Sequence, residues 1–135
     1  MFKSIITNPA HKIARLASSA PVYQRAFFGS GLSTVRQQFV IIAKDYDDEE
    51  ALTRRLSVRP AHLAATKDFK ASGKLILGGA IMSETGENAK MIGSVMIMNA
   101  DSEQEVQAIL EKDPYVTGKV WESCQILPFR TAKWE

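Results

Sequence analysis

Apolar residues occur along this chain in four short runs, separated by longer polar stretches. The runs are rich in β-branched residues and predict strands at 39–43, 74–82, 93–99 and 121–129. The stretches between them predict helices, one starting near Asp47, a second from Pro60 to about Ser72, and a third over 102–112. The order of elements is βαββαβ, which predicts a ferredoxin-like α+β fold with an antiparallel four-stranded sheet.

Both faces of the predicted sheet are apolar. In the first strand Val40 and Ile42 lie on one face while Phe39 and Ile41 lie on the other, and the third strand repeats this pattern. Helices on one side cover only one face of such a sheet. We therefore expect a homodimer in which the open faces of two sheets pack together. The alternative is a large exposed apolar patch, which is unusual for a stable monomer.

The N-terminal segment differs in composition from the rest of the chain. Residues 1–38 carry five basic residues, several hydroxyl residues and no acidic residue. Basic residues interrupt its apolar stretches, which excludes a secretory signal peptide. Ile5, Ile6, Ile13 and Leu16 would form one face of a short basic amphipathic helix. This pattern is typical of a mitochondrial transit peptide.

A second feature of this segment supports targeting. The sequence RAFFGS at 25–30 resembles a two-step processing site of the mitochondrial matrix, with a first cut after Ala26 and a mature chain that starts near Val35. We therefore expect residues 1–34 to be a cleaved, disordered transit peptide and residues 35–135 to be the folded domain of a matrix protein. The alternative is a basic tail that stays on a cytosolic protein.

Charge and composition exclude several classes of function. Residues 39–135 hold all 15 acidic residues against 12 lysines and arginines, so this part is mildly acidic and is not expected to bind nucleic acid. No apolar run reaches the roughly 20 residues that cross a bilayer. One cysteine, Cys124, and one histidine after residue 38 argue against a metal site. Nucleotide-binding motifs are absent, and we expect no cofactor.

His62 is the candidate for acid–base chemistry, because an imidazole titrates near neutral pH. On the second predicted helix it shares a face with Ala65 and Phe69, so we expect it to point toward the sheet or a crevice. Arg54, Arg55 and Arg59 precede it, and guanidinium groups bind carboxylates in a bidentate manner, which favours an anionic ligand. The alternatives are a structural histidine and a solvated helix face paired with the acidic residues at 47–50.

Asp113 is followed by Pro114, an arrangement typical of a helix start with an aspartate N-cap and proline at the first helical position. A second role would be to orient the imidazole of His62, as a carboxylate does in catalytic triads. The two roles are compatible only if this turn lies beside the helix that carries His62.

Five segments resemble motifs of the YciI-like, or YCII-related, family and occur in the same order. They are RLSVRPAHL at 55–63, KLILGG at 74–79, GSV at 93–95, DPYV at 113–116 and LPF at 127–129. The resemblance covers about residues 39–131. Two departures concern the rim of the expected pocket: Ala80 stands where the family usually has proline, and the loop at 82–89 is short and polar.

The resemblance implies a dimeric α/β barrel, in agreement with the argument from the sheet faces. It also implies that His62 and Asp113 form a catalytic pair and that Arg59, Gly79 and Tyr115 contact the substrate. Some relatives carry out eliminations on small unsaturated acids, so the resemblance implies a lyase-type enzyme acting on a small anionic, carboxylated metabolite. In it His62 would be the general base, Asp113 its orienter and Arg59 an anion clamp. The alternatives are a non-catalytic small-molecule-binding module and a structural dimeric module.

Overall fold

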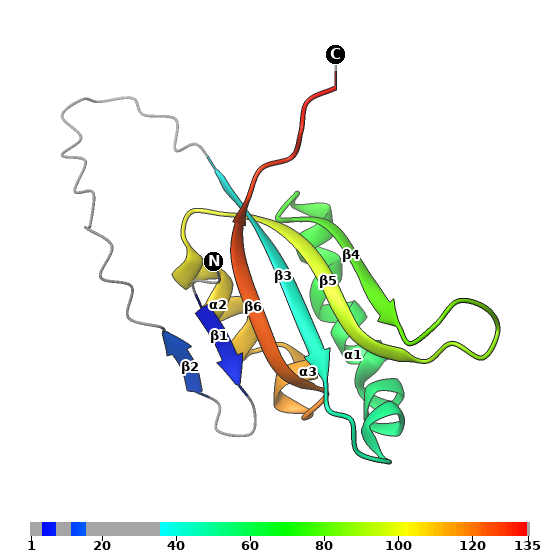
Figure 1. The fold of residues 1–135 in the computed structure, drawn as a ribbon. Coiled ribbons are helices and arrows are strands. Elements are labelled where there is room, and N and C mark those ends of the chain that lie inside the picture. The colour runs from blue at the N-terminus through cyan, green and yellow to red at the C-terminus, as the bar shows by residue number, and fades with distance from the viewer. Residues whose placement is uncertain (1–3, 8–11, 16–35, 135) are drawn as a thin grey trace, which may run out of the picture.

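The computed structural model describes residues 4–7, 12–15 and 36–134 (Figure 1). In chain order the elements are β1 (Ser4–Thr7), β2 (Lys12–Arg15), β3 (Gln37–Asp45), α1 (Ala51–Ala71), β4 (Leu75–Met82), β5 (Met91–Ala100), α2 (Glu103–Glu111), α3 (Pro114–Thr117) and β6 (Trp121–Phe129). The four predicted strands and the predicted helix after β5 are all present. Within the described ranges, no helix is both long and apolar enough to cross a membrane.

The strands form one antiparallel sheet in the order β2-β1-β6-β3-β5-β4. Its last four members, β6-β3-β5-β4, have the strand order of a ferredoxin-like fold, and this part of the prediction is confirmed. Asp113 and Tyr115 lie in the segment between α2 and β6, where α3 packs against α1. This packing brings Asp113 and Tyr115 next to α1, the helix that carries His62.

The N-terminal segment adds two strands that were not predicted. Instead of a helix or a disordered chain, Ser4–Thr7 pairs with β6, with Ser4 opposite Ile126, and Lys12–Arg15 pairs with Ser4–Thr7. The physical reason is that β6 is otherwise an edge strand, whose unpaired backbone groups accept a further strand. The rest of the expected transit peptide lies outside the described residues.

Helix α1 is continuous through Pro60, so the prediction that a second helix begins at this proline is wrong. Proline lacks the N–H that would bond the carbonyl of Leu56. Pro60 is exposed and Leu56 is 52% exposed, so that carbonyl lies where water can hydrate it. The helix therefore tolerates the proline, and His62 lies near its middle.

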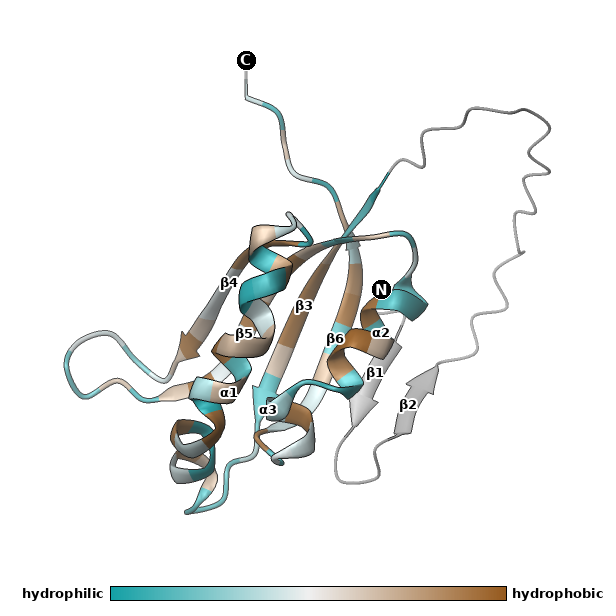
Figure 2. Ribbon diagram, turned by 180° about the vertical axis from the view of Figure 1, so that it is seen from behind, coloured by the Kyte–Doolittle hydropathy of each residue, from teal (hydrophilic) through white to brown (hydrophobic). Residues whose placement is uncertain are grey.

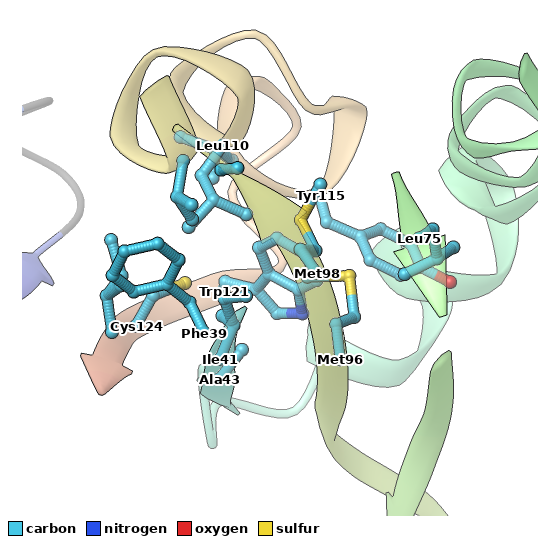
Figure 3. Close-up of a cluster of buried hydrophobic side chains, with 14 of the residues drawn as sticks. Phe39, Ile41, Ala43, Leu75, Met96, Met98, Leu110, Tyr115, Trp121 and Cys124 are labelled. Atoms are coloured by element: carbon cyan, nitrogen blue, oxygen red, sulfur yellow. The ribbon is translucent and has the colours of Figure 1, made fainter. Parts of the chain in front are cut away.

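The three helices of the described residues cover the same face of the sheet, which Figure 2 shows from the helical side. The covered face buries Phe39, Ile41 and Met98 against α2 and α3 residues that include Leu110 and Tyr115 (Figure 3). No helix within residues 36–134 lies on the opposite face of the four-stranded part (Figure 1).

That open face is apolar, as the sequence predicts. A row of four side chains crosses four adjacent strands in direct register: Leu77, Ile97, Val40 and Leu127. Leu77 is 55% exposed and the other three are half-buried.

Candidate functional site

The side of α1 that faces β4 and β5 carries mostly polar residues. At helical spacing it presents Arg55, Arg59, His62, Leu63, Thr66, Lys67 and Lys70. With residues of β4 and β5 they line a cavity of about 350 Å³. A helix that packs directly on a sheet carries apolar residues on the facing side. In this protein a cavity therefore separates much of α1 from the sheet edge.

His62, which lines this cavity, is in direct contact with Asp113. The imidazole Nδ1 lies 2.8 Å from Oδ1 and 3.0 Å from Oδ2 of Asp113. Both residues are buried, at 9% and 7% exposure. An ionised carboxylate only accepts hydrogen bonds, so Nδ1 carries the proton and Nε2 of the neutral ring is left as an acceptor.

The backbone of α3 fixes the orientation of the Asp113 carboxylate. Asp113 is the N-cap of this helix, and its Oδ1 accepts a 2.8 Å hydrogen bond from the backbone N–H of Tyr115. Pro114 follows at the first helical position. Asp113 therefore caps α3 and contacts the His62 imidazole at the same time, because the turn that it caps lies beside the helix that carries His62.

Two aromatic rings hold the plane of the imidazole. Tyr115 stacks on His62 with ring centroids 3.9 Å apart and planes 13° apart. Trp121 meets His62 edge-on, with centroids 5.7 Å apart. Burial raises the pKa of the Tyr115 phenol, so this ring stays uncharged next to the imidazole. His62 is held on one face by an aromatic ring and at Nδ1 by a carboxylate.

Arg55 lies over the ring of Tyr115 and forms a buried ion pair with Asp45. Its guanidinium donates to both carboxylate oxygens of Asp45 at 2.8 Å and to Oγ of Ser94 at 2.9 Å. It also lies 4.6 Å from the centroid of the Tyr115 ring, which is a cation–π distance. Burial raises the pKa of the Asp45 carboxyl, and the neighbouring Arg55 cation opposes that rise. Trp121 Nε1 donates to the same Ser94 oxygen at 3.2 Å.

Asp45, Ser94 and Trp121 also belong to this site, although no motif in the sequence marks them as functional. The available signal was helical spacing, since Arg55 precedes His62 by seven residues and so shares its side of the helix. Asp45, at the end of β3, then offers the carboxylate that a buried arginine requires.

The remaining candidate residues divide into surface and cavity positions. Arg54 donates two hydrogen bonds, of 2.8 and 2.7 Å, to the carboxylate of Asp48, as expected for a solvated helix face paired with the acidic residues at 47–50. This pair lowers the pKa of the Asp48 carboxyl to about 2. Arg59 and Gly79 both line the cavity. Gly79 lies in β4, the edge strand of the sheet, and pairs with Val95 of β5. Because glycine has no side chain, it contributes its backbone to the cavity wall.

Other chemistries find little support at this site. Within residues 36–134, no group of three or more His, Cys, Asp or Glu side chains is arranged to hold a metal ion. Cys124 is fully buried, and burial raises the pKa of its thiol, which disfavours a thiolate nucleophile. The chemistry that the arrangement favours is proton transfer at His62.

The fold and this site define a ferredoxin-like domain with a histidine–carboxylate pair at the wall of a cavity. Residues 38–130 match the YCII-related domain, and the chain belongs to this family. It is 38% identical over 95 residues to the protein YciI of Escherichia coli O6:H1, covering 68% of this chain and 95% of that protein.

Two further relatives have more specific names. One is the derivative of benzaldehyde biosynthesis cluster protein C of Emericella nidulans, 39% identical over 70 residues, which cover 49% of this chain and 71% of that protein. The other is a solved structure, the 5-chloro-2-hydroxyhydroquinone dehydrochlorinase TftG of Burkholderia phenoliruptrix AC1100 in complex with 2,5-dihydroxybenzoquinone. It superposes with a TM-score of 0.63 and is 28% identical, and the match covers 70% of this chain and 95% of that one.

The buried Arg55–Asp45 pair yields a stability prediction. Asp45→Ala leaves the Arg55 charge buried without its partner, so we expect the free energy of unfolding to fall by about 3–5 kcal/mol. Urea denaturation measures this loss. The matched control is Asp47→Ala, two residues along and exposed. Adding Arg55→Leu to Asp45→Ala should recover part of the stability, and equal losses in Asp45→Ala and Asp47→Ala would contradict the assignment.

Proposed function

We propose that this protein is a small-molecule enzyme of the lyase type, which removes a proton from a carboxylated metabolite. The observation that carries the proposal is the buried contact between His62 Nδ1 and the Asp113 carboxylate, 2.8 Å long, at the wall of a cavity. A general base needs an unprotonated nitrogen, a fixed ring and a space for substrate beside it. His62 has a carboxylate that fixes its tautomer, an aromatic stack that fixes its plane, and the cavity.

In the proposed step, His62 Nε2 takes a proton from a carbon of the substrate. The electron pair of the broken C–H bond forms a double bond to the neighbouring carbon, and the leaving group departs with the electrons of its own bond. The imidazole becomes a cation, which the ionised Asp113 carboxylate stabilises without itself taking the proton. His62 is then ready to return the proton to the departing anion or to water.

Arg59 is the proposed clamp for the substrate carboxylate. It lines the cavity, is exposed, and precedes His62 by three residues, which places it about one helical turn away. A guanidinium at this distance can hold a carboxylate while the carbon next to it faces the imidazole. Tyr115 supports this arrangement from behind, as the ring against which His62 is stacked.

The relatives support chemistry on small molecules. The dehydrochlorinase to which this chain is similar is named for the removal of hydrogen chloride, an elimination, and its structure holds a six-membered quinone. The relative from Emericella nidulans is named for a biosynthesis cluster. The alternative, a non-catalytic binding module, would use the same cavity, and the experiment on His62 distinguishes the two.

We also propose that the protein is a homodimer that packs through the open sheet face. The support is the apolar row Leu77, Ile97, Val40 and Leu127, which no helix of the described residues covers. Such a row on each of two sheets would form a shared core, as in a dimeric α/β barrel.

Residues 1–34 are the proposed presequence of a mitochondrial matrix protein. The support is the acid-free composition of residues 1–38 and the start of the family match at residue 38. Cleavage near Val35 would also remove β1 and β2 and so free the edge of β6.

The first prediction from this proposal concerns catalysis. Candidate substrates are small β-substituted carboxylic acids, and the readouts are release of the leaving group and exchange of carbon-bound hydrogen for deuterium, followed by NMR. His62→Gln should lower turnover roughly 10²–10⁴-fold, the usual contribution of a general base. Asp113→Asn should also lower it while the fold persists, because asparagine is an equally good N-cap.

Lys112→Gln is the matched control, since Lys112 neighbours Asp113 in sequence but is exposed and outside the cavity. Unchanged turnover in His62→Gln would contradict the proposed role. A compound that binds in the cavity and is recovered unchanged, with no deuterium exchange, would favour the binding module.

The second prediction concerns the dimer. Sedimentation of the protein that starts at Val35 should give the mass of a dimer at micromolar concentration. Ile97→Lys places a charge in the middle of the apolar row and should yield a monomer, because a buried unpaired charge is costly. Gln104→Lys adds the same charge at an exposed position of α2, on the other side of the sheet, and should leave the dimer intact. A monomeric parent protein would rule the interface out.

The third prediction concerns targeting. When the full chain is made in cells with mitochondria, mass spectrometry of the purified protein should find an N-terminus near Val35. Arg25→Ala removes the arginine of the resembled processing site and should move or abolish this cut. A protein that retains Met1 and stays in the cytosol would show that the segment is a permanent tail.

A further inference from the structure

The side chains that line the cavity have an unbalanced charge. They include four cations, Arg55, Arg59, Lys67 and Lys70, and no carboxylate. The charge of Arg55 is matched by Asp45 behind the cavity wall. Among the ion pairs of the described residues, none involves Arg59, Lys67 or Lys70. Three positive charges therefore line the cavity without an acidic partner, and only Arg59 has a place in the proposed reaction.

The two lysines lie on the far side of His62 from Arg59. Helical rise places Lys67 about 7.5 Å and Lys70 about 12 Å beyond His62 along α1, whereas Arg59 lies about 4.5 Å before it. Lys67 follows Leu63 by four residues and Lys70 follows Thr66 by four, which keeps both lysines on the side of α1 that lines the cavity. The cavity therefore has cationic groups at both ends and the imidazole between them.

A contact with the sheet edge fixes one of these charges. The ammonium of Lys70 donates a 2.6 Å hydrogen bond to the backbone carbonyl of Ile76 in β4. This bond holds the charge beside the wall formed by Leu77 and Gly78. Lys70 has further N–H donors that this single bond leaves available.

The wall between the two ends is apolar. Leu63, Leu75, Met91 and Met96 line it, and methionine sulfur packs favourably against flat unsaturated groups. Gly78 adds space, since a Cβ at this position would meet only the side chains of Met96 and Leu75 at ordinary contact distances of 3.7 and 3.8 Å. A cavity of about 350 Å³ also falls within the range of sites for larger ligands than a short acid.

We propose that Lys67 and Lys70 form a second oxyanion-binding site, so that the ligand is an elongated molecule with an anionic group at each end. One end would lie at Arg59 and His62, an apolar segment would lie against Leu75 and Met96, and the distal anion would lie at the lysines. This inference rests on the proposed function, because that function places the reacting end at His62.

The test is a binding series that needs no turnover. Linear dicarboxylates from succinate through suberate to dodecanedioate are titrated calorimetrically against wild-type protein, each beside the monocarboxylate of equal length. Long dicarboxylates should bind more tightly than their monocarboxylate partners, and succinate should gain no such advantage. Each lysine should contribute a roughly two- to five-fold gain, as exposed ion pairs do, and added salt should reduce it.

Lys67→Gln and Lys70→Gln together should abolish the advantage of the long dicarboxylates while leaving monocarboxylate affinity unchanged. The control Lys112→Gln removes an exposed charge outside the cavity and should change neither. Replacing the distal carboxylate by a phosphonate shows which oxyanion is preferred. Equal affinities for long dicarboxylates and monocarboxylates, or equal losses for both in the double variant, would overturn the proposal.

The outcome is separable from that of the catalytic proposal. Deuterium exchange at carbon, measured on the same wild-type protein, reports on His62, whereas the length series reports on the lysines. A protein that binds long dicarboxylates through the lysines but never exchanges carbon-bound hydrogen would retain the distal site and refute the lyase.

Discussion

Helix α1 is held over the sheet by buried polar side chains, and the other features of the site depend on this. Its buried residues are Ala51, Arg55 and His62. A buried arginine requires a carboxylate, which Asp45 supplies, and a buried imidazole requires a hydrogen-bond partner, which Asp113 supplies. Val58 and Phe69 of α1 pack against the core, whereas the side of the helix toward β4 carries mostly polar residues, and there the cavity lies.

The same contacts order the candidate base. Arg55 lies over Tyr115, and Tyr115 stacks on His62, so the ion pair under the helix supports the ring that supports the imidazole. Asp113 combines two tasks, because it caps α3 and accepts from His62 with the same carboxylate. Groups that stabilise the fold are therefore also those that orient His62, and preorganisation of this kind is what proton transfer requires.

The sequence predicted those features that depend on local pattern. Strand order and the apolar open face followed from the runs of β-branched residues, and His62 and Asp113 followed from motif resemblance. The helix start predicted at Pro60 is wrong because local propensity takes no account of the exposure of Pro60 and Leu56 in the folded protein. The Arg55–Asp45 pair depends on contacts between distant elements, and β1 on an edge that only the folded sheet creates. Helical spacing points to Arg55 as a neighbour of His62, but no local pattern points to the pairing of β1 with β6.

The proposed chemistry depends on Asp113 holding His62 as the Nδ1–H tautomer, with Nε2 left to accept a proton. Nitrogen NMR of the ring in labelled protein measures this directly, with His62→Gln identifying the signals. We expect a protonated Nδ1 and an unprotonated Nε2 in the neutral ring, and a loss of this preference in Asp113→Asn. A neutral ring protonated at Nε2 in the wild type would contradict it.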